Sequence, residues 1–171
     1  MAGEDEIYYV VVQKPLLHEE LERLAREVAD DEDQERKAEE IVQARSMRIA
    51  LTSASRRQAY RRMAAQNAAR DWFAKRIGVK SWLEIDGDVL KGLDVDTHHE
   101  WLAVWSACDV IGALVPEACE NWEPPERLED WAELKDYIFQ PLIRRTWELN
   151  PQWLNEWQEQ QAIVEETLPG N

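Results

Sequence analysis

The residues from Asp94 to Glu100 place carboxylates and imidazoles closer together than any other part of the sequence. These side chains can hold a divalent ion, which would be the basis of a metal-dependent enzyme. The two adjacent histidines lack the helical spacing of a zinc protease motif. Acidic residues are also favoured at a helix start by capping and by the helix dipole. Because Thr97 and Glu100 fit a capping box, we interpret the cluster as a helix start and predict no metal site.

Cys108 is a candidate nucleophile, because a cysteine thiolate can attack an electrophilic substrate. It lies on an apolar stripe with Trp101, Val104 and Trp105. A catalytic thiol needs a lowered pKa and a paired base, and the nearest histidines lie at the other end of the same predicted helix. We therefore interpret Cys108 as a buried structural residue. The sequence also lacks a glycine-rich phosphate loop and a nucleophile elbow, so we expect a non-enzymatic protein without a cofactor.

Charge is distributed unevenly along the chain, whose net charge is −15. Residues 1–44 carry 5 basic and 14 acidic side chains, residues 45–80 carry 10 and 1, and residues 81–171 carry 5 and 20. A hypothetical basic patch on the central block could contact phosphates, and its residues are Arg56, Arg57, Arg61 and Arg62. The acidic whole would repel nucleic acid, so the simpler interpretation is internal neutralisation by acidic neighbours. The alternative is that the block binds an acidic partner.

The nine tryptophans are the most distinctive feature of the composition. Aromatic residues at helical spacing usually face the core, and we expect this of Trp72, Trp101 and Trp105. Nine rings are difficult to hide in a chain of this length, and tryptophan is enriched at binding anchors. We therefore hypothesise an exposed groove that binds an amphipathic partner helix. Its predicted residues are Trp131, Ile138, Trp147, Trp153 and Trp157.

The stretch from Leu128 to Leu154 should position these rings. Asp130 could cap one helix, Pro141 should end or kink it and begin another, and Asn150-Pro151 should begin a third. Upstream, the chain predicts a strand at 7–12 and a helix from residue 16 whose stripe resumes at Ala38 and continues to Ile49. The capping box at Ser55 predicts a helix that ends at Gly78.

Asp86-Gly87 favours a tight turn between two β-prone runs, which predicts a hairpin near 81–93, with 7–12 as a plausible third strand. The expected fold is therefore mainly α, a helical domain with a small antiparallel β element.

We expect one domain over 1–171, organised in consecutive parts. These are a flexible end at 1–6, a strand and acidic helices at 7–51, the basic helix, hairpin and central helix at 52–121, and tryptophan-rich helices at 126–168. No run is long enough to span a membrane. With two cysteines and no secretory signal, we expect a cytoplasmic protein, and an oligomer is compatible with the sequence.

The C-terminal part resembles the helical end of phage tail assembly chaperones. The resemblance lies in Asp130-Trp131, the apolar helix through Ile138, and Trp147-Glu-Leu-Asn-Pro-Gln-Trp153, about a quarter of the chain. It implies a non-enzymatic, acidic, largely helical protein made in the host cytoplasm. Such proteins coat the tape-measure protein and help deliver tail-tube subunits to it.

A second function class remains open. An acidic protein can imitate nucleic-acid phosphates and occupy a basic site on a host protein, as an inhibitor of the phage anti-host or anti-CRISPR kind would. Such a charge mimic should lose its target steeply as salt rises. An aromatic groove should keep its partner.

Overall fold

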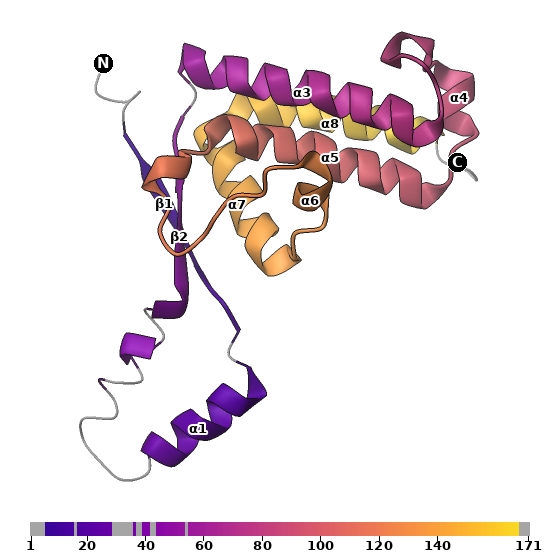
Figure 1. Ribbon diagram of the computed structural model, residues 1–171. Coiled ribbons are helices and arrows are strands. Elements are labelled where there is room, and N and C mark those ends of the chain that lie inside the picture. Colours follow the sequence, from indigo (N-terminus) through magenta and orange to yellow (C-terminus); the bar gives the residue numbers. More distant parts are fainter. Residues whose placement is uncertain are drawn as a thin grey trace.

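A computed structural model describes residues 6–15, 17–28, 36, 39–41, 44–53 and 55–167. It divides into a helical body, residues 55–167, and an N-terminal arm that extends away from it (Figure 1). The fold class predicted from the sequence is confirmed, because most of the described residues are helical and two strands form a small antiparallel sheet.

Helix α5 (Val95–Ala113) is the centre of the helical body. It contacts α3 (Arg56–Ile77), α6 (Leu128–Ala132), α7 (Asp136–Leu149) and α8 (Pro151–Thr167). A helix surrounded in this way must be apolar on most of its sides, and α5 buries residues on every side from Val104 to Val110. The short helices η1 (Trp82–Glu84) and α4 (Gly87–Lys91) connect α3 to α5, and η2 (Pro116–Ala118) follows α5.

Two apolar clusters hold the body together. One joins the sheet to α5, α7 and α8 and includes Met47, Val110 and Leu142. The other lies between α3 and α5 and includes Phe73 and Trp101, whose ring centroids are 4.8 Å apart. Trp72, Trp101 and Trp105 belong to this second cluster, as the helical spacing predicts.

The arm consists of β1 (Tyr8–Gln13), α1 (His18–Val28) and β2 (Ser46–Leu51). The strands pair antiparallel with Tyr8 opposite Leu51 and Gln13 opposite Ser46, and α1 lies at the end away from the body (Figure 1). Alternate residues of β2 face the core, because side chains of a strand point to opposite faces in turn. The other edge of β2 bonds to the segment after α5, with Arg48 opposite Glu120 and Leu51 opposite Leu114.

The prediction of a hairpin near 81–93 is wrong. No strand forms at 81–93, where η1 and α4 lie instead. The Asp86 carboxylate accepts a hydrogen bond from the Val89 N–H at 3.0 Å and so caps α4 instead of leading a turn. The partner of β1 is the stretch 46–51, where the sequence predicts a helical stripe that continues to Ile49, so this prediction is wrong. Its Met47, Ile49 and Leu51 alternate with a period of two, which is typical of a strand.

Three predicted helix boundaries are also wrong. Asp94, and not Thr97, caps α5. Arg127 occupies the N-cap position of α6, so Asp130 lies inside that helix. Of the two outcomes predicted at Pro141, an end or a kink, the end is wrong, because Pro141 lies inside α7, which continues to Leu149. A proline six positions into a helix lacks the N–H that would bond to Tyr137, and the remaining packing tolerates this loss.

Other boundaries agree with their predictions. Gln58 accepts the Ser55 N–H at 2.8 Å at the start of α3, Gly78 ends that helix with a positive φ of 83°, and α8 begins at Pro151. The expected flexible end, acidic run and resumed helical stripe at Ala38 fall largely outside the described residues.

Candidate binding groove and the buried arginine beside it

A groove of about 210 Å³ lies where α5, α6, α7 and α8 meet. Its walls combine apolar and aromatic side chains with a few polar ones. The lining residues are Leu102, Ala103, Ser106, Trp131, Ala132, Leu134, Asp136, Phe139, Gln140 and Trp157. We call it the α5–α8 groove.

Local structure fixes the aromatic walls of the groove. The Trp131 indole N–H donates to the Pro125 carbonyl at 3.0 Å, which anchors the ring against the linker before α6. Trp157 packs beside Trp147, with ring centroids 5.1 Å apart. Its indole nitrogen is buried and has no hydrogen-bond partner among the described residues. Small side chains at Ala103 and Ser106, three positions apart on one face of α5, leave the space between these rings open.

The size and chemistry of the groove limit what it can do. Pockets that enclose small-molecule ligands usually have volumes of about 300–1,000 Å³, so this groove is small for that purpose. It suits a few apolar side chains of a protein partner. Asp136 and Gln140 at its α7 wall offer hydrogen-bond acceptors to the partner's polar rim.

Only some of the predicted partner-binding residues line the groove. Trp131 and Trp157 do. Trp153 is buried, and Trp147 and Ile138 pack against the first core cluster, so these three do not. Trp131 itself exposes only 3% of its surface. As groove-lining residues, Ile138, Trp147 and Trp153 are therefore wrong, because their side chains pack in or against the first core cluster.

Most of the remaining wall residues carry no signal in the sequence. Leu102, Phe139 and Gln140 are ordinary residues of amphipathic helices and carry no distinguishing motif. A signal did exist at Ala103 and Ser106, since small residues spaced by one helical turn allow a gap or a close approach.

Next to the groove, Arg62 crosses from α3 into the core. Its Nε donates to Asp109 of α5 at 2.6 Å and its Nη2 donates to Glu156 of α8 at 2.5 Å. The guanidinium also lies over the Trp153 ring, 4.7 Å from its centroid. Trp147 of α7 completes the cluster by donating from Nε1 to Asp109 at 2.9 Å. One charged cluster therefore ties α3, α5, α7 and α8 together.

Burial raises the pKa of the Asp109 carboxyl, and the charge of Arg62 with the hydrogen bonds from Trp147 and Arg62 opposes this rise.

The helices α3 and α5 are closely packed at this cluster. A Cβ added at Gly112 would lie 2.7 Å from the Cβ of Arg62 and 3.3 Å from Cη2 of Trp153. Glycine at this position lets α3 approach α5 closely enough for Arg62 to reach Asp109.

The hypothetical basic patch is divided by the fold. Arg56 and Arg57 are exposed, whereas Arg62 is buried in the ion pairs just described. Arg61 is half-buried and donates to the Leu114 carbonyl at 3.0 Å. The four arginines do not form one exposed surface, and at Arg62 the predicted internal neutralisation by an acidic neighbour is present.

Arg57 and Arg61 also line a second, polar cavity of about 300 Å³ at the start of α3.

The cluster from Asp94 to Glu100 serves to begin α5. The Asp94 carboxylate accepts the Thr97 N–H at 2.7 Å, and bonding to Thr97 lowers the pKa of Asp94. His98 is fully buried, with Nε2 2.8 Å from the Leu90 carbonyl. Glu100 pairs with Arg76 of α3 at 3.4 Å.

Within the described ranges, no group of three or more acidic, histidine or cysteine side chains could hold a metal ion.

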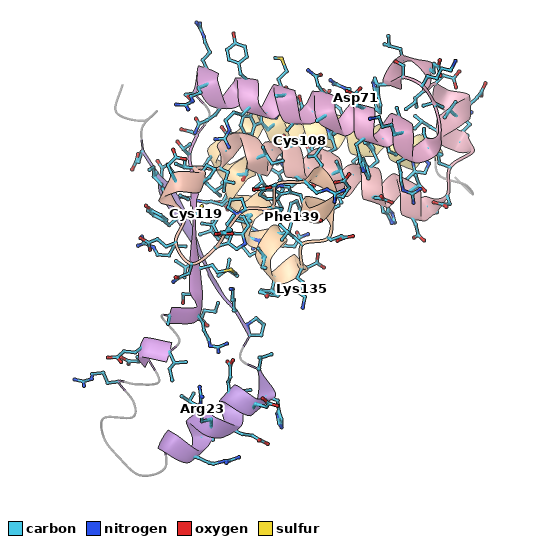
Figure 2. All side chains as sticks on the ribbon, viewed as in Figure 1. Arg23, Asp71, Cys108, Cys119, Lys135 and Phe139 are labelled. Atoms are coloured by element: carbon cyan, nitrogen blue, oxygen red, sulfur yellow. The ribbon has the colours of Figure 1, made fainter. Side chains whose placement is uncertain are left out.

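Cys108 is a core residue, as predicted. It is completely buried in the second cluster and donates from Sγ to the Val104 carbonyl at 3.4 Å. Burial, with a smaller contribution from the neighbouring Asp109 charge, raises the pKa of its thiol to about 12. Figure 2 labels it within the helical body, while Cys119 lies beside the strands.

Comparisons with family models, curated proteins and solved structures yield no match for this chain. Among the helices that the structure describes, none combines the length and apolar character needed to cross a membrane.

Proposed function

We propose that this chain is a non-enzymatic protein-binding protein whose α5–α8 groove receives apolar side chains of an amphipathic partner helix. The groove itself carries the proposal, because it places Trp131, Trp157 and Phe139 around an open space between four helices. Helix-in-groove recognition uses a row of apolar anchors one helical turn apart. The acidic surface, with a net charge of −15, would keep such a complex soluble.

The resemblance of the C-terminal part to phage tail assembly chaperones names a candidate partner. The partner would be a tape-measure protein, and the chain would keep its long apolar helix soluble in the host cytoplasm and bring tail-tube subunits to it. The residues of the resemblance include Trp131 of the groove, together with Trp147 and Trp153 that support it from α7 and α8.

Co-expression with a helical tape-measure fragment, followed by affinity purification, tests this function. Ala103→Glu places a charge in the groove wall and should abolish retention of the fragment. Ala68→Glu makes the same change on the exposed side of α3 and should leave retention unchanged. Circular dichroism of both variants shows whether the fold persists. Equal retention by both folded variants would reject the groove as the binding site.

The acidic surface also favours a second candidate, an inhibitor that imitates nucleic-acid phosphates. The exposed residues Glu120, Glu123 and Glu126 lie in the segment before α6, where Glu120 pairs with Arg48, and Glu133 directly follows α6. Binding to a basic target should weaken steeply between low and moderate salt because exposed charges are screened over about 10 Å at 0.1 M salt. Groove binding should change little over the same range.

A further inference from the structure

Strand β1 has one edge that no described residue covers with backbone hydrogen bonds. Its neighbour on one side is β2, and β2 in turn bonds on its far side to Glu120 and Ala113. The sheet therefore ends at β1. Val11 is 60% exposed and Tyr9 is 39% exposed on this strand.

The register identifies which backbone groups face outward from β1. Lys14 donates its N–H to the Arg45 carbonyl, so the even-numbered residues of β1 face β2 in the ladder. Tyr9, Val11 and Gln13 consequently point their N–H and C=O groups to the open edge.

This edge lacks the devices that usually prevent strands from pairing. Natural proteins protect an edge with a proline, a charged side chain or a bulge. Between Tyr8 and Gln13 the sequence has no proline and no charge, and the pairing with β2 runs without a bulge. This six-residue edge is uncharged, and Tyr9, Val11 and Gln13, whose backbone groups point outward, are exposed, so it is suited to receive another strand.

We propose that β1 pairs antiparallel with β1 of a second copy of this chain, which gives a two-fold symmetric dimer with a continuous four-stranded sheet. In the register that places Val10 opposite the partner's Val10, Tyr9 bonds to the partner's Val11, and Val11 to the partner's Tyr9. Aromatic and β-branched residues are a favourable cross-strand pair. Two-fold symmetry repeats each contact, as in most homodimers.

Charge complementarity selects this register and this partner. The strand is bounded by one acidic residue, Glu6, and one basic residue, Lys14, both exposed. With Val10 opposite its own copy, Glu6 lies opposite the partner's Lys14 at each end of the pairing. A shift of one residue in each strand, which places Val11 on the symmetry axis, would put Lys14 opposite the partner's Tyr8 and lose both pairs. A foreign strand would need the same spacing of opposite charges.

Sedimentation equilibrium of the full chain over a wide range of concentration tests the dimer. The unmodified chain should show reversible dimerisation. Val11→Pro removes the N–H that donates to the partner's Tyr9 but none that bonds to β2, and it should yield a monomer. Val11→Lys places a charge at the edge and should also yield a monomer. It tests the same edge without introducing a proline that could disturb folding. Val95→Lys, at another exposed valine on α5, is the matched control and should dimerise normally.

Charge reversal tests the register itself. Glu6→Lys and Lys14→Glu should each weaken dimerisation by roughly tenfold, because each change affects two symmetric ion pairs. The double variant should return to within about threefold of the original. A chain that stays monomeric throughout, or a dimer that persists in folded Val11→Pro and Val11→Lys, overturns the proposal. Because these substitutions lie in the arm and Ala103→Glu lies in the groove, failure of one proposal is distinguishable from failure of the other.

Discussion

Leu142 in α7 and Leu21 in α1 show how the helical body and the arm differ. Leu142 is completely buried, whereas Leu21 is 48% exposed on an amphipathic helix at the far end of the arm. The body also encloses ion-paired polar groups such as Arg62 and Asp109. In the arm, Glu22 and Arg26 form an exposed pair, and Glu20 forms a partly buried pair with Arg45. The difference indicates that stability is concentrated in the body and in β2, whose Met47, Ile49 and Leu51 are fully buried against it. The arm presents surfaces whose side chains are available to a partner.

We expect the largest loss of unfolding free energy when a substitution breaks the charged cluster of the body. Arg62→Ala leaves Asp109 buried without its cation, and loss of one partner of a buried pair costs about 3–5 kcal/mol of unfolding free energy. Urea denaturation monitored by tryptophan fluorescence measures this loss. The double variant Arg62→Met with Asp109→Leu removes both charges and should recover much of it. A loss below about 1 kcal/mol for the single variant would mean that the pair is far more hydrated than its burial indicates.

The second prediction uses thiol chemistry to compare the two regions. Since the thiolate is the reactive form, a pKa of about 12 should slow alkylation of Cys108 at pH 9 by roughly a hundredfold or more relative to an exposed cysteine. Ala25→Cys, on the exposed part of α1, provides that reference in the arm. Mass spectrometry of the iodoacetamide-treated chain measures both rates.

The pKa of Cys108 also has a consequence for stability. The folded thiol ionises at higher pH than the unfolded one, so its contribution to stability is complete below the ordinary pKa of 9.0 and decreases as the pH rises above it. Rapid alkylation of Cys108 at pH 9 in the folded chain would contradict its burial.

The smallest predicted effect lies in the arm. Leu21→Ala should change the unfolding free energy by about 0.5 kcal/mol or less, because exposed positions away from packed contacts are tolerant. Leu142→Ala is the matched substitution in the body and should cost several times more. The same urea titration measures both. Equal losses of unfolding free energy in the two variants would contradict the exposure of Leu21, because they would require α1 to be packed as tightly as α7.

The sequence predicted local structure better than the contacts between distant residues. The box at Ser55 and the stop at Gly78 depend on neighbours within a few positions, and both were found. Asp86-Gly87 was ambiguous, since aspartate favours both a turn and a helix N-cap. The tertiary context chose the cap.

The candidate site was less predictable, because its parts come from four helices. Trp131 and Trp157 were selected for the groove on composition, but no local signal distinguished them from the buried Trp153. The ion pair of Arg62 with Asp109 joins residues 47 positions apart. Charge distribution indicated that such pairing would occur, and only the packing of α3 on α5 identifies the partners.

Strand β2 lies between β1 and a segment that the ribosome makes much later. Arg48 exchanges backbone hydrogen bonds of 2.9 and 2.8 Å with Glu120, a separation of 72 residues. At about 5–20 residues per second, translation of that interval takes roughly 4–14 s. During this time the pair of β1 and β2 has both edges exposed, so a chaperone that shields extended segments should bind the first 51 residues before it binds any other part of the chain.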